Sequence, residues 1–196
     1  MQNQIQKSTT LRGVNSFLPD SYIVPDKSKQ FLKLSPGENK LRILSSPLLG
    51  FVFFNEENKP VRRSFDQGAY TNEELVELNA KKGEDGEIQS SKHFWIMLVW
   101  DYNTKSPKIL ELTQISILKP LFELAQDQDW GDLREFNINI GKTGSSKLDT
   151  EYTVVPKPHS ALSNEINDVI DELEQKNLLN LNAIWEGNYP FESYNW

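Results

Sequence analysis

The chain has 196 residues and a formal net charge of −7, and 37% of its residues are hydrophobic. It contains no cysteine, which excludes disulfide bonds and thiolate metal sites and fits a reducing compartment. No apolar run reaches the ~18–20 residues of a membrane helix, and the polar start, Met1 to Asn15, is not a secretory signal. We therefore expect one domain with solvated extensions, in the cytoplasm and without a membrane partner.

The charge is distributed unevenly along the chain. Residues 1–65 have a net charge of +5, residues 66–91 of −5, residues 92–158 of −1 and residues 159–196 of −6. The acidic residues therefore concentrate in one internal segment and in the C-terminal segment, and the remaining body is mildly basic. This asymmetry is compatible with a nucleic-acid partner for the body, although an acidic tail also has a plain solubilising role.

Composition divides the chain into three parts. Residues 1–28 are polar and predict a flexible N-terminal arm. Residues 29–158 predict the folded domain, interrupted by a polar insertion over residues 66–91 that contains one short helix. Residues 159–196 predict an acidic helix, followed by a tail that mixes aromatic and acidic residues.

Alternating polar and apolar residues predict the strands of the domain. Extended structure begins near Gln30, residues 40–44 alternate as a half-buried strand, and residues 51–54 continue it after a bulge or sharp bend at Gly50. The strongest strand signal is Lys92 to Tyr102, with seven consecutive apolar residues. Further strands are predicted over residues 108–112, 134–140 and 151–155.

Helical spacing of apolar residues after Thr113 predicts a helix that Pro120 kinks or divides. A second helix is predicted around Ile166 to Leu173, with Ser163 as its N-cap. The order of a bent strand, a hairpin, a helix and two strands predicts a mainly β fold. We expect a five-stranded Greek-key barrel of the oligonucleotide-binding (OB) type, with a helix between strands 3 and 4.

Catalytic and metal-binding patterns are absent from the sequence. The two histidines, His93 and His159, have no nucleophile motif nearby, and two histidines without cysteine do not indicate a metal site. Gly141 to Thr143 resembles the end of a phosphate-binding loop, but Phe136 stands where the motif needs its first glycine. We therefore predict a protein that is not an enzyme and uses no metal or cofactor. A nuclease, the enzymatic alternative, requires clustered carboxylates for Mg²⁺, whereas the acids here fall mainly in the insertion and the tail.

Rings and cations alternate on the predicted strands. On Lys92 to Tyr102 one face is entirely apolar, and the other carries Trp95 between polar ends, which suits a partly wet surface. Proteins that bind single strands stack bases on exposed rings beside cations that contact phosphates. We expect Phe54, Trp100 and Phe136 in the core. The predicted nucleic-acid site consists of Phe51, Phe53, Lys59, Arg62, Arg63, Phe65, Tyr70, Lys92, His93, Trp95, Lys108 and Lys142.

Several short motifs within about residues 30–158 resemble the phage-encoded single-stranded DNA-binding proteins with an OB fold. They are Phe31 to Leu34, Leu41 to Leu44, Lys92 to Trp95, Val99 to Asn103, Ile109 to Gln114 with Ser116 and Ile117, Asp129 to Asp132, and Tyr152 to Val154. The resemblance implies cooperative coating of single-stranded DNA, with self-association on the DNA. This coating would protect DNA during phage replication, recombination or repair in the host bacterial cytoplasm.

The C-terminal segment carries a second resemblance. Pro190 and Phe191 follow an acidic stretch, which is similar to the acidic Pro-Phe ending of bacterial single-stranded DNA-binding proteins. That ending docks replication and repair enzymes. Five residues follow Phe191 here, so the terminal carboxylate of the motif is displaced. The resemblance implies a tail that recruits replication or recombination proteins, and the acidic tail is also expected to compete with DNA for the basic groove. The alternative function is a protein-interaction module whose groove binds a peptide and no nucleic acid.

Overall fold

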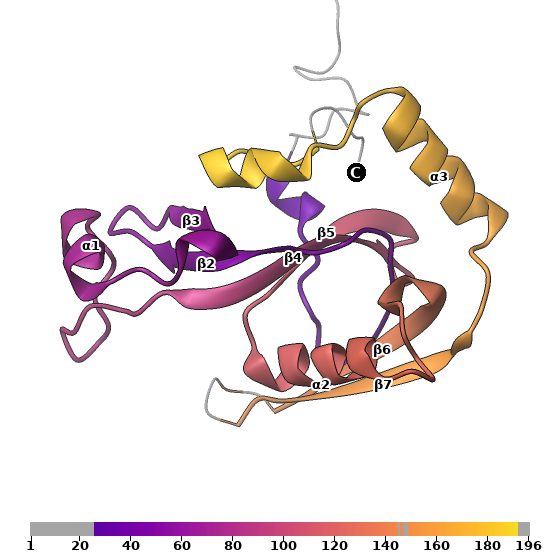
Figure 1. Ribbon diagram of the computed structural model, residues 1–196, viewed down its shortest axis with the longest axis horizontal. Coiled ribbons are helices and arrows are strands. Elements are labelled where there is room, and N and C mark those ends of the chain that lie inside the picture. Colours follow the sequence, from indigo (N-terminus) through magenta and orange to yellow (C-terminus); the bar gives the residue numbers. More distant parts are fainter. Residues whose placement is uncertain (1–25, 145, 147–148, 192–196) are drawn as a thin grey trace, which may run out of the picture.

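A computed structural model describes residues 26–144, 146 and 149–191. The predicted arm over residues 1–28 therefore lies almost entirely outside the described residues. Figure 1 shows an antiparallel sheet with helices on both sides. The strands are β1 (Gly37–Ile43), β2 (Leu48–Phe54), β3 (Pro60–Ser64), β4 (Lys92–Asp101), β5 (Ser106–Leu112), β6 (Phe136–Thr143) and β7 (Glu151–His159). The helices are α1 (Asn72–Glu77), α2 (Ile115–Gln126) and α3 (Asn164–Gln175), and the 3-10 turns are η1 (Lys27–Gln30), η2 (Phe65–Gln67), η3 (Leu133–Glu135) and η4 (Leu181–Glu186).

The sheet is open, so the prediction of a closed five-stranded barrel is wrong. Its strand order is β3-β2-β4-β1-β6-β7, and β5 pairs with the other edge of β4. Closure would require β7 to pair with the outer edge of β5, and no such pairing exists among the described residues. Part of that edge is already occupied: Phe31 bridges Ile109 in parallel, and the backbone N–H of Leu32 donates to the Ile109 carbonyl at 2.8 Å. The fold is thus mixed α/β, with seven strands.

Several predicted elements are confirmed. The hairpin of β4 and β5 is followed by a helix, α2, which leads into β6. The expectation that Pro120 divides this helix is wrong, because α2 continues through that residue. Helix α3 begins after Ser163, whose hydroxyl accepts a hydrogen bond from the Ile166 N–H as an N-cap. Within the part of the chain that the structure describes, no helix is long and apolar enough to cross a membrane.

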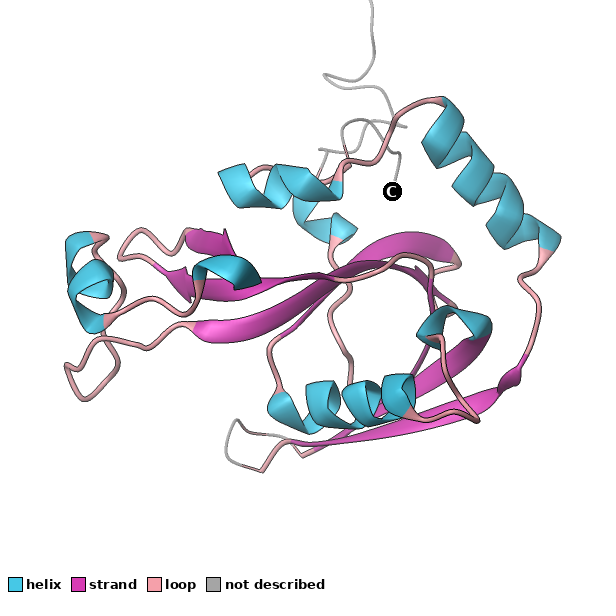
Figure 2. Ribbon diagram, viewed as in Figure 1, coloured by secondary structure: helices cyan, strands magenta, loops and turns pink. Residues whose placement is uncertain are grey.

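Both faces of β4 are covered, which corrects the expectation of one wet face (Figure 2). One face, called the α2 face, packs against helix α2. Its core is formed by Leu41, Ile43, Met97, Val99, Leu110, Leu112, Ile117, Leu118, Leu121, Phe136, Ile138 and Ile140. The opposite face, called the α3 face, packs against the C-terminal segment. Its core is formed by Val52, Phe94, Ile96, Leu98, Ile109, Leu173, Ile184 and Phe191. Trp100 and Phe136 are buried as expected, whereas Phe54 is 47% exposed.

The insertion over residues 66–91 packs against the end of the β2–β3 hairpin. Leu75 of α1 and Ala80 are buried against Phe53 in a small core of their own. Arg63 of β3 donates to both carboxylate oxygens of Glu74, at 2.8 and 3.0 Å. The short helix α1 is therefore held to the sheet by both an apolar and an ionic contact.

Gly50 lies within β2, paired with Ser64 on one side and Phe94 on the other, and does not form the predicted bulge. A Cβ at this position would press on the carbonyl oxygen of Arg63 and lie 2.9 Å from the Phe94 ring. We expect Gly50→Ala to lower the free energy of unfolding by about 1–3 kcal/mol, the usual cost of overpacking. Urea denaturation measures this change, with the exposed neighbour Ser46→Ala as control. Equal stability of the two variants would contradict the close approach seen here.

Candidate nucleic-acid interface

Four of the predicted site residues, Phe51, Phe65, His93 and Trp95, form one ring cluster on the α2 face. Phe51 and Phe65 are stacked with ring centroids 5.8 Å apart, and His93 lies 5.5 Å from each of them. The Trp95 indole N–H donates to Nε2 of His93 at 3.1 Å, and Nδ1 of His93 lies 2.9 Å from the Gly50 carbonyl oxygen. Because an indole can only donate, Nε2 accepts and Nδ1 carries the hydrogen. The cluster is therefore fixed by directed contacts, and only Phe65, at 53%, is strongly exposed.

Three of the predicted phosphate contacts are neutralised by carboxylates. Lys59 pairs with Glu57 at 2.7 Å on the surface. Arg62 pairs with Glu111 at 2.8 Å, and its side chain is only 6% exposed. Arg63 is held by Glu74 and by the carbonyls of residues 68 and 69, and its guanidinium lies over the Tyr70 ring at 3.9 Å. Arg62 therefore joins β3 to β5, and Arg63 joins β3 to the insertion.

Four other predicted residues are also held inside the fold. The Lys108 ammonium donates to the Lys29 carbonyl at 2.7 Å, and burial lowers its pKa below the usual range of lysine. Lys142 donates to the Leu34 carbonyl at 3.2 Å. Phe53 is 3% exposed and meets the Tyr70 ring edge-on at 4.8 Å, and burial raises the pKa of the Tyr70 phenol. These residues contribute stability more than binding surface.

Three adjoining grooves open on the opposite side of the sheet, and Phe31 lines all of them. The first, of about 790 Å³, lies between the β2–β3 hairpin and the segment around η4. The second, of about 730 Å³, lies between η1 and the β4–β5 turn. The third, of about 330 Å³, lies along β2 and the end of β5. The first two share Ser28 and Lys33, and the first and third share Phe54 and Glu111, so the grooves form one surface, called the Phe31 trough below.

Aromatic rings line the trough from three separate parts of the chain. Phe54 at the end of β2 is 47% exposed, and Tyr189 in the C-terminal segment is 42% exposed. The Phe31 and Tyr189 rings meet edge-on with centroids 6.3 Å apart, and the Lys27 ammonium lies over the Tyr189 ring at 5.9 Å. Trp185 lines the first groove beside them. Ring faces are therefore available in a concave surface, which is the geometry that base stacking requires.

The trough is basic although the chain is acidic. Its lining includes seven basic residues, Lys29, Lys33, Lys59, Arg62, Lys92, Lys105 and Lys108, against four acidic ones, Asp26, Asp101, Glu111 and Glu186. Within the described ranges, Lys29, Lys33, Lys92 and Lys105 form no ion pair with a carboxylate, and all four are exposed. These lysines are the cations that remain available to an anionic ligand.

The structure therefore divides the predicted site. Phe53, Lys59, Arg62, Lys92 and Lys108 line the trough. Phe51, Arg63, Phe65, Tyr70, His93, Trp95 and Lys142 do not line it.

Sequence reasoning missed Phe31, Lys33, Phe54 and the C-terminal rings Trp185 and Tyr189. The run from Phe31 to Lys33 combines a ring with one cation, but its apolar residues also predict the beginning of a strand. Phe54 was expected in the core, but it is exposed. Alternation shows which face of a strand a side chain points to, and it does not show how far other elements cover that face. No local signal places Trp185 and Tyr189 against residues more than 150 positions earlier in the chain.

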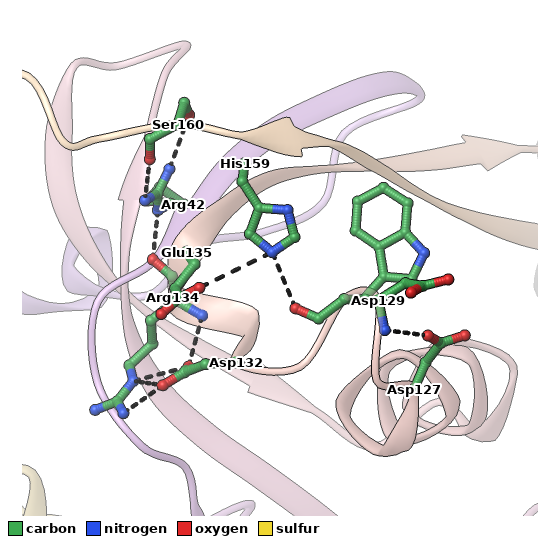
Figure 3. Close-up of polar contacts among 9 residues, drawn as sticks. Arg42, Asp127, Asp129, Asp132, Arg134, Glu135, His159 and Ser160 are labelled. Carbon is green, nitrogen blue, oxygen red and sulfur yellow. Dashed lines mark hydrogen bonds and ion pairs between the residues drawn. The ribbon is translucent and has the colours of Figure 1, made fainter.

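A second aromatic cluster lies at the far end of the sheet, and Figure 3 shows the polar contacts of His159, one of its members. The Trp130 and His159 rings are stacked 5.8 Å apart, and both meet the Phe136 ring. Nε2 of His159 lies 3.0 Å from the Trp130 carbonyl oxygen and 3.9 Å from the Glu135 carboxylate. These contacts join the loop after α2 to β6 and the end of β7.

Among the described residues, no group of three or more His, Cys, Asp or Glu side chains is placed to hold a metal ion.

Comparison of the chain with protein-family models, with curated proteins and with solved structures finds no match.

Proposed function

We propose that the chain binds single-stranded DNA in the Phe31 trough, with little sequence preference and without catalysis. The observation that carries this proposal is the meeting of exposed rings and unpaired lysines in one concave surface at Phe31. Bases stack on the rings, and the lysines contact phosphates. The biological role follows the family resemblance: protection of single-stranded DNA in the bacterial cytoplasm during phage replication, recombination or repair, with partner proteins at the complex.

The chemistry of the trough favours a single strand over a duplex. A ring such as Phe54 or Tyr189 stacks only on a base whose face is exposed, and the faces of duplex bases are already covered. Every base offers such a face, so discrimination between sequences is small. Lysines supply a salt-dependent attraction that acts on any phosphate backbone.

Titration with oligo-dT tests this proposal through the intrinsic tryptophan fluorescence, because Trp185 lines the first groove. We expect quenching whose apparent affinity falls with salt, by a slope near −0.7 per phosphate contact. Duplex DNA of the same length and oligo-U serve as comparisons. Absence of salt-dependent quenching would overturn nucleic-acid binding and favour the peptide-binding alternative. Incubation of DNA with Mg²⁺ tests the nuclease alternative, and no cleavage is expected.

Two exposed phenylalanines, one on each face of the sheet, test which face binds DNA. Phe54 lines the trough and is 47% exposed, whereas Phe65 belongs to the α2-face ring cluster and is 53% exposed. We expect Phe54→Ala to weaken oligo-dT binding by about 5–100-fold, the loss of one stacked base, and Phe65→Ala to leave it unchanged. Fluorescence anisotropy of labelled oligo-dT measures both. Weaker binding by Phe65→Ala and unchanged binding by Phe54→Ala would instead assign the interface to the ring cluster of Phe51, Phe65, His93 and Trp95.

A further inference from the structure

The C-terminal segment forms part of the trough surface. Residues 185–189 line the first groove, facing the β2–β3 hairpin. Tyr189 is the ring of this segment that meets Phe31, and it lies under the Lys27 ammonium. In Figure 1 the same segment, in yellow, passes above β2 and β3.

This segment is anchored at residues 190 and 191. The Phe191 N–H donates to Oε1 of Gln30 at 3.0 Å, and Nε2 of Gln30 donates to the Phe191 carbonyl at 2.9 Å. Gln30 is 2% exposed and Phe191 is 1% exposed. Phe191 also bridges Leu179, and the Asn180 N–H donates to the Pro190 carbonyl at 2.8 Å. The segment from 179 to 191 is thus a closed loop whose two ends meet beside a buried amide pair.

Most acidic residues of the described C-terminal segment lie outside the trough. The acidic residues of α3 are Glu165, Asp168, Asp171, Glu172 and Glu174, and none of them lines the trough. Glu186 is the acidic residue of the described C-terminal segment that lines it. A competing segment needs several negative charges among the phosphate-binding cations, whereas the described part of this segment places a single carboxylate there, that of Glu186, beside the Trp185 and Tyr189 rings.

We infer that residues 179–191 are a fixed wall of the single-strand binding site, which raises the affinity for DNA and stays in place when DNA is bound. The inference rests on the proposed function and reverses the sequence-based expectation of a competing tail. It also means that Phe191 holds this wall to Gln30, while the Pro190 carbonyl closes the loop onto Asn180.

Hydrogen exchange of the full chain, with and without saturating oligo-dT, separates a wall from a competitor. A wall predicts slower exchange of peptides within residues 179–191 on DNA binding, by about fivefold or more, because closing a site over a ligand suppresses local opening. Peptides of α2 serve as the internal control. Faster or unchanged exchange over 179–191 would overturn the inference, since a displaced or uninvolved segment gains no protection.

A pair of variants supplies the second measurement. Tyr189→Ala should weaken oligo-dT binding by about fivefold or more, and Tyr189→Phe should retain it, because stacking needs the ring and not the hydroxyl. Phe122→Ala, on the opposite side of the molecule and 54% exposed, is the matched control. If the unmodified chain does not bind oligo-dT, the proposed function itself fails. Binding by the unmodified chain, with equal or tighter binding by Tyr189→Ala, overturns only the wall.

Discussion

Replacing both Lys33 and Lys92 by glutamate lowers the affinity for oligo-dT by about 10–100-fold at about 0.1 M salt. Both lysines line the Phe31 trough, and neither has a carboxylate partner within the described residues. Each reversal removes one phosphate contact and adds a repulsion. The slope of the logarithm of affinity against the logarithm of salt concentration should fall in magnitude by about 1.4, which is two contacts at about 0.7 each. Anisotropy titrations at three salt concentrations measure both quantities.

The matched control for this double variant is Lys119→Glu with Lys157→Glu. It changes the net charge by the same amount, but Lys119 lies on α2 and Lys157 on β7, outside the trough. We expect its affinity and salt slope to stay close to those of the unmodified chain. Equal losses in the two double variants would show that net charge, and not the trough, governs binding.

Arg42→Ala is expected to be among the most destabilising substitutions in the domain, at about 2–4 kcal/mol. Arg42 of β1 is 3% exposed, and burial lowers the pKa of its guanidinium. As Figure 3 shows, Nε donates to the Arg134 carbonyl and Nη2 donates to the Ser160 carbonyl, each at 2.7 Å. Removing the side chain leaves two backbone acceptors without their donors and opens a cavity between η3 and the end of β7. Urea denaturation followed by circular dichroism measures the loss.

Two further variants define the cause of this loss. Arg42→Lys should recover only part of it, because one ammonium does not reproduce the fork that reaches both carbonyls. Arg134→Ala should cost at most about 0.5 kcal/mol, because that side chain is half exposed and its ion pair is with Asp132, only two residues away. A loss below about 1 kcal/mol for Arg42→Ala would contradict the role given to the guanidinium.

Local periodicity was sufficient to predict most of the strands and helices. The apolar run of β4 and the spacing from Ile117 to Leu121 reflect burial along one element, which is encoded in neighbouring residues. Closure of the sheet depends instead on what reaches the outer edge of β5. Phe31 and Leu32 reach that edge from almost 80 residues earlier in the chain, and no local pattern records this competition.

The same limit explains the partial success of the site prediction. Alternation places His93 and Trp95 on one face of their strand, but it does not show which part of that face stays uncovered. Arg62 and Arg63 were expected to contact phosphates, and their partners Glu111 and Glu74 lie 49 and 11 residues away. A cation is available only where the fold brings no carboxylate to it, and that condition is a property of the tertiary structure.

The Gln30–Phe191 amide pair links positions 161 residues apart, and this separation affects the order of folding. All seven strands end by His159, so the sheet has its complete sequence before Phe191 is synthesised. Because domains form from the N-terminal side during synthesis, a nascent chain has its strands while the groove around Phe31 still lacks one side. Closing so long a loop costs only slightly more entropy than closing a shorter one. Completion of the groove is therefore a late step in biogenesis, and under the proposed function tight contact with nucleic acid waits until translation has passed residue 191.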